Sequence, residues 1–185
     1  GELPIARVAD EIETPGAGQI RGLVLNAGNI ALSAPNATRI DKALRSLEAV
    51  VAVDIHVNET TRHAHVILPP TFGLEHDHFP LLFHGVAVRN TAHYSPAVLA
   101  IDDHRRDDAW ILSRLAAGIA RRRGAHLTSL AVSLLARVLP PKRMLSLLLR
   151  LGPYRSRRLT LAALERAPHG IDLGPLTSRL PAALL

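Results

Sequence analysis

Two short apolar runs with an amphipathic stretch between them dominate the hydrophobic pattern of the first third of the chain. The runs at residues 20–25 and 50–55 are rich in β-branched residues and nearly continuous, which is typical of parallel strands covered on both faces. Between them, apolar residues from Ile40 to Leu47 recur at the spacing of one buried helical face, with Asn36 as its N-cap. A third short strand is predicted at 65–68. The pattern therefore predicts an α/β, Rossmann-like fold with a short, mostly parallel sheet flanked by helices.

From residue 107 onward the pattern is helical. Acidic residues at 107–108, basic residues at 121–123 and Gly124 mark the two ends of one predicted helix. Further helical patterns cover 128–139, 144–149 and 159–166, the last with Thr160 as a cap, while 152–158 has the composition of a linker and 167–174 of a loop. Before this portion, 75–78 is predicted to be an exposed loop and 81–88 an extended segment. We therefore expect an α/β core over 1–100 and a helical portion over 101–185 that packs on it or extends it.

Composition narrows the class of protein. Hydrophobic residues make up 48% and charged residues 21% of the 185 residues, which are values of a globular domain. The chain has no cysteine, so it holds no disulfide, iron–sulfur ligand or thiolate metal site, and a reducing, cytoplasmic location is expected. No apolar run approaches the roughly 20 residues that a membrane span requires. Because the chain begins at Gly1 and its one methionine is Met144, we expect a fragment of a longer protein.

The net charge of +6 is unevenly distributed, with −3 over residues 1–100 and +9 over residues 101–185. A basic half is compatible with nucleic acid or an anionic membrane as partner. The favoured interpretation is a solvated helix face or a surface that meets the rest of a parent protein, because aromatic residues, at 3%, leave little for base stacking. For the apolar run at 145–149, a core or an interdomain contact is likewise favoured over a membrane-surface helix. No nucleic-acid partner is expected.

Polar residues follow both apolar runs, and in βαβ units ligands bind beyond the carboxyl ends of the strands. Asp54 is the first candidate, since a strand-end carboxylate can accept hydrogen bonds from guanine N1–H and the 2-amino group, or bind a ribose hydroxyl. The alternative for Asp54 is that it caps a neighbouring turn or helix. Gly28 and Asn29 allow close backbone approach and an amide contact, but they also suit an ordinary turn. Neither a G-x-G-x-x-G nor a G-x-x-x-x-G-K-[ST] motif is present.

The ten histidines raise the alternative of a metal site. The pairs at 63 and 65 and at 76 and 78, with Glu75 and Asp77 nearby, each offer two imidazoles. Histidine is common on solvated loops, however, and the chain has no H-E-x-x-H motif. G-x-S-x-G is also absent, which disfavours a serine hydrolase. The sequence therefore favours neither a metal site nor a catalytic residue within this chain.

Four spaced motifs resemble one family. They are GQIRGLVLNAGN at 18–29, VDIHVNETTRHAHVILPP at 53–70, LEHDH at 74–78 and VRN at 88–90, and the likeness continues through Trp110 and 168–174. Together these motifs resemble the molybdopterin oxidoreductases, the dimethyl sulfoxide reductase and formate dehydrogenase group that carries a bis(molybdopterin guanine dinucleotide) cofactor. The resemblance covers nearly the whole chain. It implies an interior α/β domain that grips the guanosine end of one pterin dinucleotide.

The resemblance also implies the residues of this grip. A Gly-Asn-Pro loop of the family corresponds to residues 28–30, with Asn29 as ligand, and a strand-end Ser-Asp pair to residues 53–54, with Asp54 facing guanine. Ile30 replaces the proline and Val53 the serine, so a backbone contact is expected at 53 and a hydroxyl contact is not. His65 stands where the family usually has aspartate, and His76 where some members have a cofactor-contacting lysine. The residues expected to bind the cofactor are Gly28, Asn29, Ile30, Ser33, Val53, Asp54 and His76.

The parent protein implied by the resemblance is a molybdenum or tungsten oxidoreductase that moves two electrons with an oxygen atom or a proton. Its metal ligand, cluster-binding cysteines and active-site residues are expected outside this chain, which alone should be inactive and bind no cofactor tightly. Its partners would be the remaining domains of the parent and the nucleotide tail of the cofactor. The alternative, of another class, is a non-catalytic nucleotide-binding or interaction module that uses the basic helices.

Overall fold

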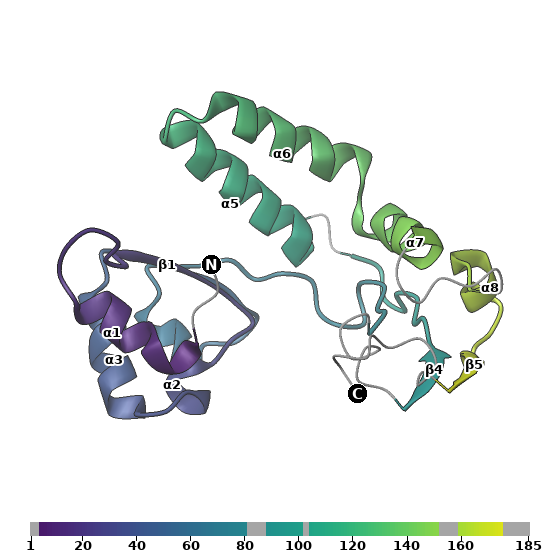
Figure 1. The fold of residues 1–185 in the computed structure, drawn as a ribbon, viewed down its shortest axis with the longest axis horizontal. Coiled ribbons are helices and arrows are strands. Elements are labelled where there is room, and N and C mark those ends of the chain that lie inside the picture. Colours follow the sequence, from purple (N-terminus) through teal and green to yellow (C-terminus); the bar gives the residue numbers. More distant parts are fainter. Residues whose placement is uncertain (1–3, 81–87, 102–103, 152–158, 176–185) are drawn as a thin grey trace. The chain divides into compact units, whose positions relative to one another are not determined.

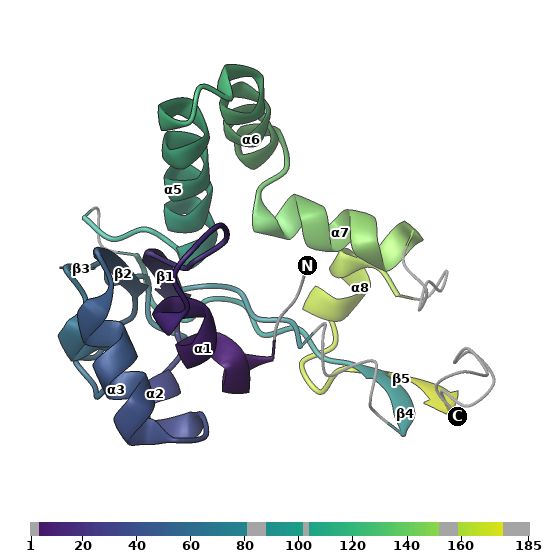
Figure 2. The same cartoon turned by 60° about the vertical axis from the view of Figure 1, so that its left-hand side comes forward.

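The computed structural model describes residues 4–80, 88–101, 104–151 and 159–175. The chain divides into two compact units, the first formed by residues 1–71 and 103–111 and the second by residues 72–102 and 112–185 (Figures 1 and 2). Each unit is described by itself. Most of the predicted extended segment, residues 81–87, and the predicted linker at 152–158 lie outside the described residues.

A three-stranded parallel sheet forms the centre of the first unit, as the apolar runs predict. The strands lie in the order β1-β2-β3, with β1 at Gly22–Asn26, β2 at Ala49–Val53 and β3 at Val66–Ile67. In the register of β1 and β2, Asn26 lies opposite Val53, so both strands end at the same edge of the sheet. With the helices around it, this sheet confirms the predicted α/β class.

Helices α1, α2 and α3 contribute to the core of the first unit. Ile40 and Leu44 of α3 are 2% and 1% exposed and belong to one apolar cluster with Val50 of β2 and Leu25 of β1. The prediction that both faces of the sheet are covered is wrong for β1. Val24 lies on the face opposite to Leu25 and is 42% exposed. The helical segments of this unit are η1 (Ile5–Arg7), α1 (Val8–Glu13), α2 (Ile30–Ser33), α3 (Ala37–Ser46) and η2 (Thr61–His63).

Asn36 caps α3, as its place before the amphipathic stretch predicts. Its backbone is left-handed, with φ at 61°, and its side-chain oxygen accepts a hydrogen bond of 3.3 Å from the Arg39 amide. Replacing Asn36 with alanine removes the cap and strains a left-handed backbone, so we expect a loss of about 1–2 kcal/mol in unfolding free energy. Asn36→Gly, which tolerates that backbone, should cost only a few tenths of a kcal/mol. Urea unfolding measures both losses, and equal losses would contradict this role of the left-handed backbone.

The second unit contains a strand pair that the sequence pattern does not predict. Strand β4 (Arg89–Ala92) pairs antiparallel with β5 (Ile171–Pro175), so the prediction of a loop over 167–174 is wrong for its last residues. At the start of this pairing, a Cβ on Gly170 would lie 2.7 Å from the carbonyl oxygen of Ala92, and its φ is 78°. Only glycine, which has no Cβ and tolerates a positive φ, fits at this position. The Arg89 guanidinium also pairs with Asp172 at 2.7 Å across the two strands.

The helical C-terminal portion is confirmed. Gly124 has a φ of 78° and directly follows Arg123, the last residue of the predicted basic end. The Thr160 hydroxyl accepts a hydrogen bond from the Ala163 amide at the start of α8. Among the residues that the structure describes, no helix is long and apolar enough to cross a membrane. The helices are α5 (Asp108–Arg122), α6 (His126–Val138), α7 (Pro141–Leu151) and α8 (Leu161–Glu165).

The segment at 75–78 is only partly the exposed loop that its polarity predicts. Glu75 is 4% exposed, and its carboxylate accepts a hydrogen bond of 2.7 Å from the Phe72 amide. Asp77 accepts a hydrogen bond of 3.0 Å from the Ala97 amide. The prediction is therefore wrong for Glu75, because this acidic side chain closes its own turn and is buried by doing so.

Candidate functional site

The two loops predicted to carry function begin side by side at the carboxyl edge of the parallel sheet. Asn26 and Val53 are paired residues at the ends of β1 and β2, and the chain beyond each is polar. The Ala27 amide donates a hydrogen bond of 3.0 Å to the Val53 carbonyl oxygen. The first loop, residues 27–33, and the second loop, residues 54–61, are therefore joined at their first residues.

Asn29 connects the first loop to the second through both ends of its side-chain amide. Its Nδ2 donates a hydrogen bond of 2.7 Å to Glu59 Oε2, and its Oδ1 accepts one of 2.8 Å from the Thr60 hydroxyl. The same hydroxyl oxygen accepts a hydrogen bond of 2.9 Å from the Ala31 amide. The hydrogen bond from Asn29 holds the pKa of Glu59 below its ordinary value. Thr60 is fully buried, so it fixes the position of the first loop from inside the protein.

Asp54 is half-buried and lies in a turn closed by side chains of the second loop. Its Oδ1 accepts a hydrogen bond of 2.9 Å from the His56 amide, and its Oδ2 accepts one of 3.3 Å from Asn58 Nδ2. The other end of Asn58, Oδ1, accepts hydrogen bonds from the amides of Thr60 and Thr61 at 3.0 and 2.9 Å. Asp54 thus caps a turn, the alternative that the sequence left open, and its carboxylate is held in one place by that turn.

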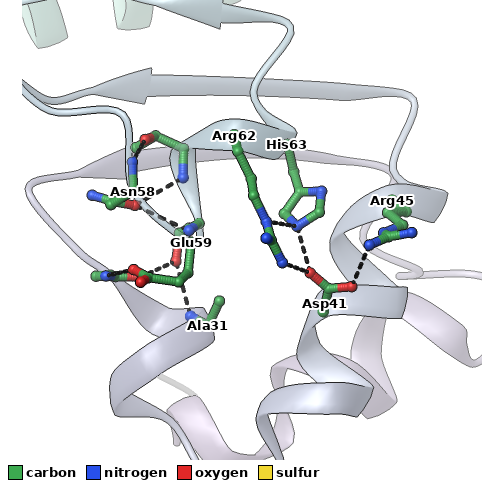
Figure 3. A network of polar contacts seen from close by, with 10 residues as sticks. Ala31, Asp41, Arg45, Asn58, Glu59, Arg62 and His63 are labelled. Carbon is green, nitrogen blue, oxygen red and sulfur yellow. Dashed lines mark hydrogen bonds and ion pairs between the residues drawn. The ribbon is translucent and has the colours of Figure 1, made fainter.

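A second anchor holds the end of this loop against α3. Asp41 of α3 forms ion pairs with Arg45, one turn further along, and with Arg62 of η2, and lies 2.7 Å from His63 Nε2 (Figure 3). Hydrogen bonds from Arg62 and then His63 lower the pKa of Asp41. Figure 3 shows Asn58 and Glu59 on the same segment as Arg62 and His63, with Ala31 beside Glu59. The second loop is therefore held at both of its ends.

The predicted site residues fall into two groups. Six of them lie along the first loop and at the end of β2. Within this group, Ile30 is buried at the start of α2, and the Ser33 hydroxyl donates a hydrogen bond of 2.9 Å to the Asn29 carbonyl oxygen. His76 is half-buried and belongs to the second unit. The group at the sheet edge consists of Gly28, Asn29, Ile30, Ser33, Val53 and Asp54.

The structure adds four residues of the second loop, those at 58–61, that are not among the seven residues predicted to bind the cofactor. They form the sequence Asn-Glu-Thr-Thr after a strand and its turn, and three of the four have short side chains that can bond to nearby backbone. That composition is the one signal in the sequence. Thr60 bonds to residues 29 and 31, some thirty positions earlier in the chain. No periodic pattern in the sequence indicates these contacts.

The histidines at 63 and 65 have separate structural roles. His63 contacts Asp41, whereas His65 Nδ1 accepts a hydrogen bond of 3.0 Å from the Val50 amide and so joins β2 to the chain before β3. Across the described residues, no group of three or more histidine, cysteine, aspartate and glutamate side chains could hold a metal ion. The chemistry that the sheet edge offers is hydrogen bonding by fixed carboxylate and amide groups.

Comparison with known proteins gives two matches. Residues 2–117 match the molybdopterin oxidoreductase family. A stretch of 76 residues is 43% identical to the assimilatory nitrate reductase catalytic subunit of Bacillus subtilis (strain 168), which is 40% of this chain and 11% of that relative. The matched part thus spans about a tenth of the length of the curated relative.

Proposed function

The chain belongs to the molybdopterin oxidoreductase family, whose match covers more than half of it, and on this premise we propose that the sheet edge holds the guanosine end of a molybdopterin guanine dinucleotide. The first and second loops would form the two sides of the purine site. The proposed role is binding and positioning, because such cofactors carry the reaction chemistry while the protein supplies orientation. The geometry of Asp54 is the observation that supports this proposal most strongly.

The acceptor positions that Asp54 has left after closing its turn match the hydrogen-bond donors of guanine. An ionised carboxylate offers about four acceptor positions, and the turn uses one on each oxygen. One acceptor per oxygen is thus left for the parallel N1–H and 2-amino donors of guanine. Because the His56 amide and Asn58 fix the carboxylate before binding, little conformational entropy would be lost when the base docks.

Asn29 and Gly28 fit a supporting role. One Nδ2 hydrogen and one Oδ1 lone pair of Asn29 remain after its bonds to Glu59 and Thr60, so the amide can still contact a ligand while it joins the two loops. A Cβ on Gly28 would lie 3.8 Å from the Asn26 carbonyl oxygen, an ordinary van der Waals distance, so the fold itself does not require glycine here. The proposed use of Gly28 is that the missing side chain lets a ligand approach the backbone closely. The Val53 carbonyl oxygen accepts the Ala27 amide and keeps a second acceptor position, so the backbone contact expected at Val53 remains part of the proposal. Ile30 and Ser33 would shape the loop.

The remaining parts of the reaction are proposed to lie outside this chain. It has no cysteine to ligate molybdenum, tungsten or an iron–sulfur cluster, and the described residues hold no cluster of metal ligands. The metal of the bound cofactor would supply the electron transfer. The Bacillus relative is named a nitrate reductase, but only 11% of it is matched, so we extend to this chain the cofactor-holding role and not the substrate. We expect the chain alone to be inactive and cytoplasmic.

Titration of the ¹⁵N-labelled chain with GMP tests the proposal. We expect amide shifts that grow with GMP concentration and are concentrated at Gly28, Asn29 and 54–60. Shifts confined to the arginine-rich helices would instead support the alternative of a basic interaction module. If no amide in the two loops moves at millimolar GMP, the proposed guanosine site is wrong.

A further inference from the structure

Helix α6 exposes its most apolar side. Leu127, Leu130, Leu134 and Val138 recur at helical spacing along one stripe and are 84%, 66%, 58% and 55% exposed, and Leu135 beside them is 57% exposed. No residue of α6 is buried. A surface helix normally turns such a stripe toward the core. These five residues, called the α6 stripe below, therefore mark a contact surface.

The sequence around the stripe is basic throughout. Between Asp108 and Glu165 the chain has no acidic residue and eleven lysine and arginine residues. Exposed arginines at 121–123 end α5, which lies beside α6 in both views of the ribbon (Figures 1 and 2). At the other end, Arg137 is in the last turn of α6 and Arg143 Nη1 donates a hydrogen bond of 3.2 Å to the Val138 carbonyl oxygen. Positive charge thus flanks both ends of the stripe.

We propose that the α6 stripe docks on the surface of an anionic phospholipid bilayer, with α6 lying in the plane of the interface. The leucines would enter the boundary between headgroups and acyl chains, and the flanking arginines would pair with lipid phosphates. This binding is peripheral. It is also independent of the proposed guanosine site, because α6 lies beyond the residues that match the family, 2–117.

Charge and apolarity together select this partner over two others. A second copy of the chain would bring one acid-free basic surface against another, which is repulsive. A nucleic acid would satisfy the arginines but gains nothing from exposed leucines, and the one aromatic residue between Asp108 and the end of α7 is Trp110. The apolar run at 145–149 is not part of this proposed membrane contact, because Leu149 is buried in the core of the second unit.

Co-sedimentation of the full chain with lipid vesicles tests this inference. At 0.1 M salt we expect the chain to pellet with vesicles rich in phosphatidylglycerol and to stay in solution with pure phosphatidylcholine vesicles. The double variant Leu130→Glu, Leu134→Glu should lower the partition into anionic vesicles at least tenfold. The matched control is Val98→Glu, Leu99→Glu, which adds the same charge at exposed apolar residues of the same unit and should lower it less than threefold.

Circular dichroism and the GMP titration establish that both variants are folded. The inference is wrong if the wild-type chain does not bind anionic vesicles, or if the two double variants bind equally. A second contradicting result is that the wild-type chain binds no vesicles but forms a dimer, and that the double variant Leu130→Glu, Leu134→Glu abolishes this dimer. A third is that the wild-type chain and Leu130→Glu, Leu134→Glu bind anionic vesicles equally well and bind duplex DNA equally well. That result would show that charge alone drives binding, which contradicts a role for the α6 stripe.

Discussion

Replacing Thr60 with valine is expected to lower the unfolding free energy of the chain by about 3 kcal/mol, since it leaves buried polar groups without partners. Valine keeps the shape of threonine but removes the hydroxyl that donates to Asn29 Oδ1 and accepts from the Ala31 amide. Both Thr60 and Ala31 are buried, so water does not readily replace the lost bonds. The first loop should separate from the second as a consequence.

Urea unfolding measures the loss of stability, and hydrogen exchange of the amides at 27–33 measures the separation of the loops. Thr60→Ser keeps the hydroxyl and should recover most of the stability. Thr38→Val makes the same chemical change at an exposed position of α3 and should alter stability by less than about 0.5 kcal/mol. A Thr60→Val variant as stable as Thr38→Val would show that the hydroxyl does not hold the loops.

The sequence pattern predicts the elements of the first unit because local chemistry determines them. The β-branched runs become β1 and β2, and Ile40, Ala43 and Leu44 form the buried face of α3. Asn36 lies at the N-cap of α3 and Gly124 just after the end of α5, and both residues have a left-handed backbone. The edge of the sheet that carries the candidate site follows from the same reasoning, since parallel strands joined by helices end on one side.

What the pattern misses depends on individual hydrogen bonds and strand pairings, which leave no periodic signal in the sequence. Strand β5 contains Gly174 and Pro175, which have little strand propensity, and it forms only through pairing with residues some eighty positions earlier. Glu75 is buried because its carboxylate closes a turn, which charge alone does not predict. The contact between Asn29 and Thr60 likewise joins two loops without periodicity. Local propensity does not encode any of these three.

Asp54→Asn should weaken the binding of GMP by about a hundredfold. Two hydrogen bonds to a charged acceptor contribute about 3 kcal/mol or more in total, and each 1.4 kcal/mol is tenfold in affinity. The variant also turns an amide donor toward the donors of guanine. Asparagine keeps the size of Asp54 and an oxygen for the His56 amide but cannot accept the bond from Asn58 Nδ2. We expect the turn to persist through the bond from the His56 amide and the two that Asn58 Oδ1 accepts from the amides of Thr60 and Thr61. Glu48→Gln, which neutralises an exposed carboxylate paired with Arg21, is the matched control and should leave GMP affinity within twofold.

Isothermal titration of wild type and Asp54→Asn with GMP and with IMP tests most directly whether Asp54 recognises guanine. IMP differs from GMP only in lacking the 2-amino group, so it removes one of the two proposed hydrogen bonds. We predict that the wild-type chain binds GMP about tenfold more tightly than IMP, as expected for one hydrogen bond to a carboxylate, and that this preference disappears in Asp54→Asn. Equal affinity of the wild-type chain for the two nucleotides, or an undiminished preference in Asp54→Asn, would contradict the guanosine site.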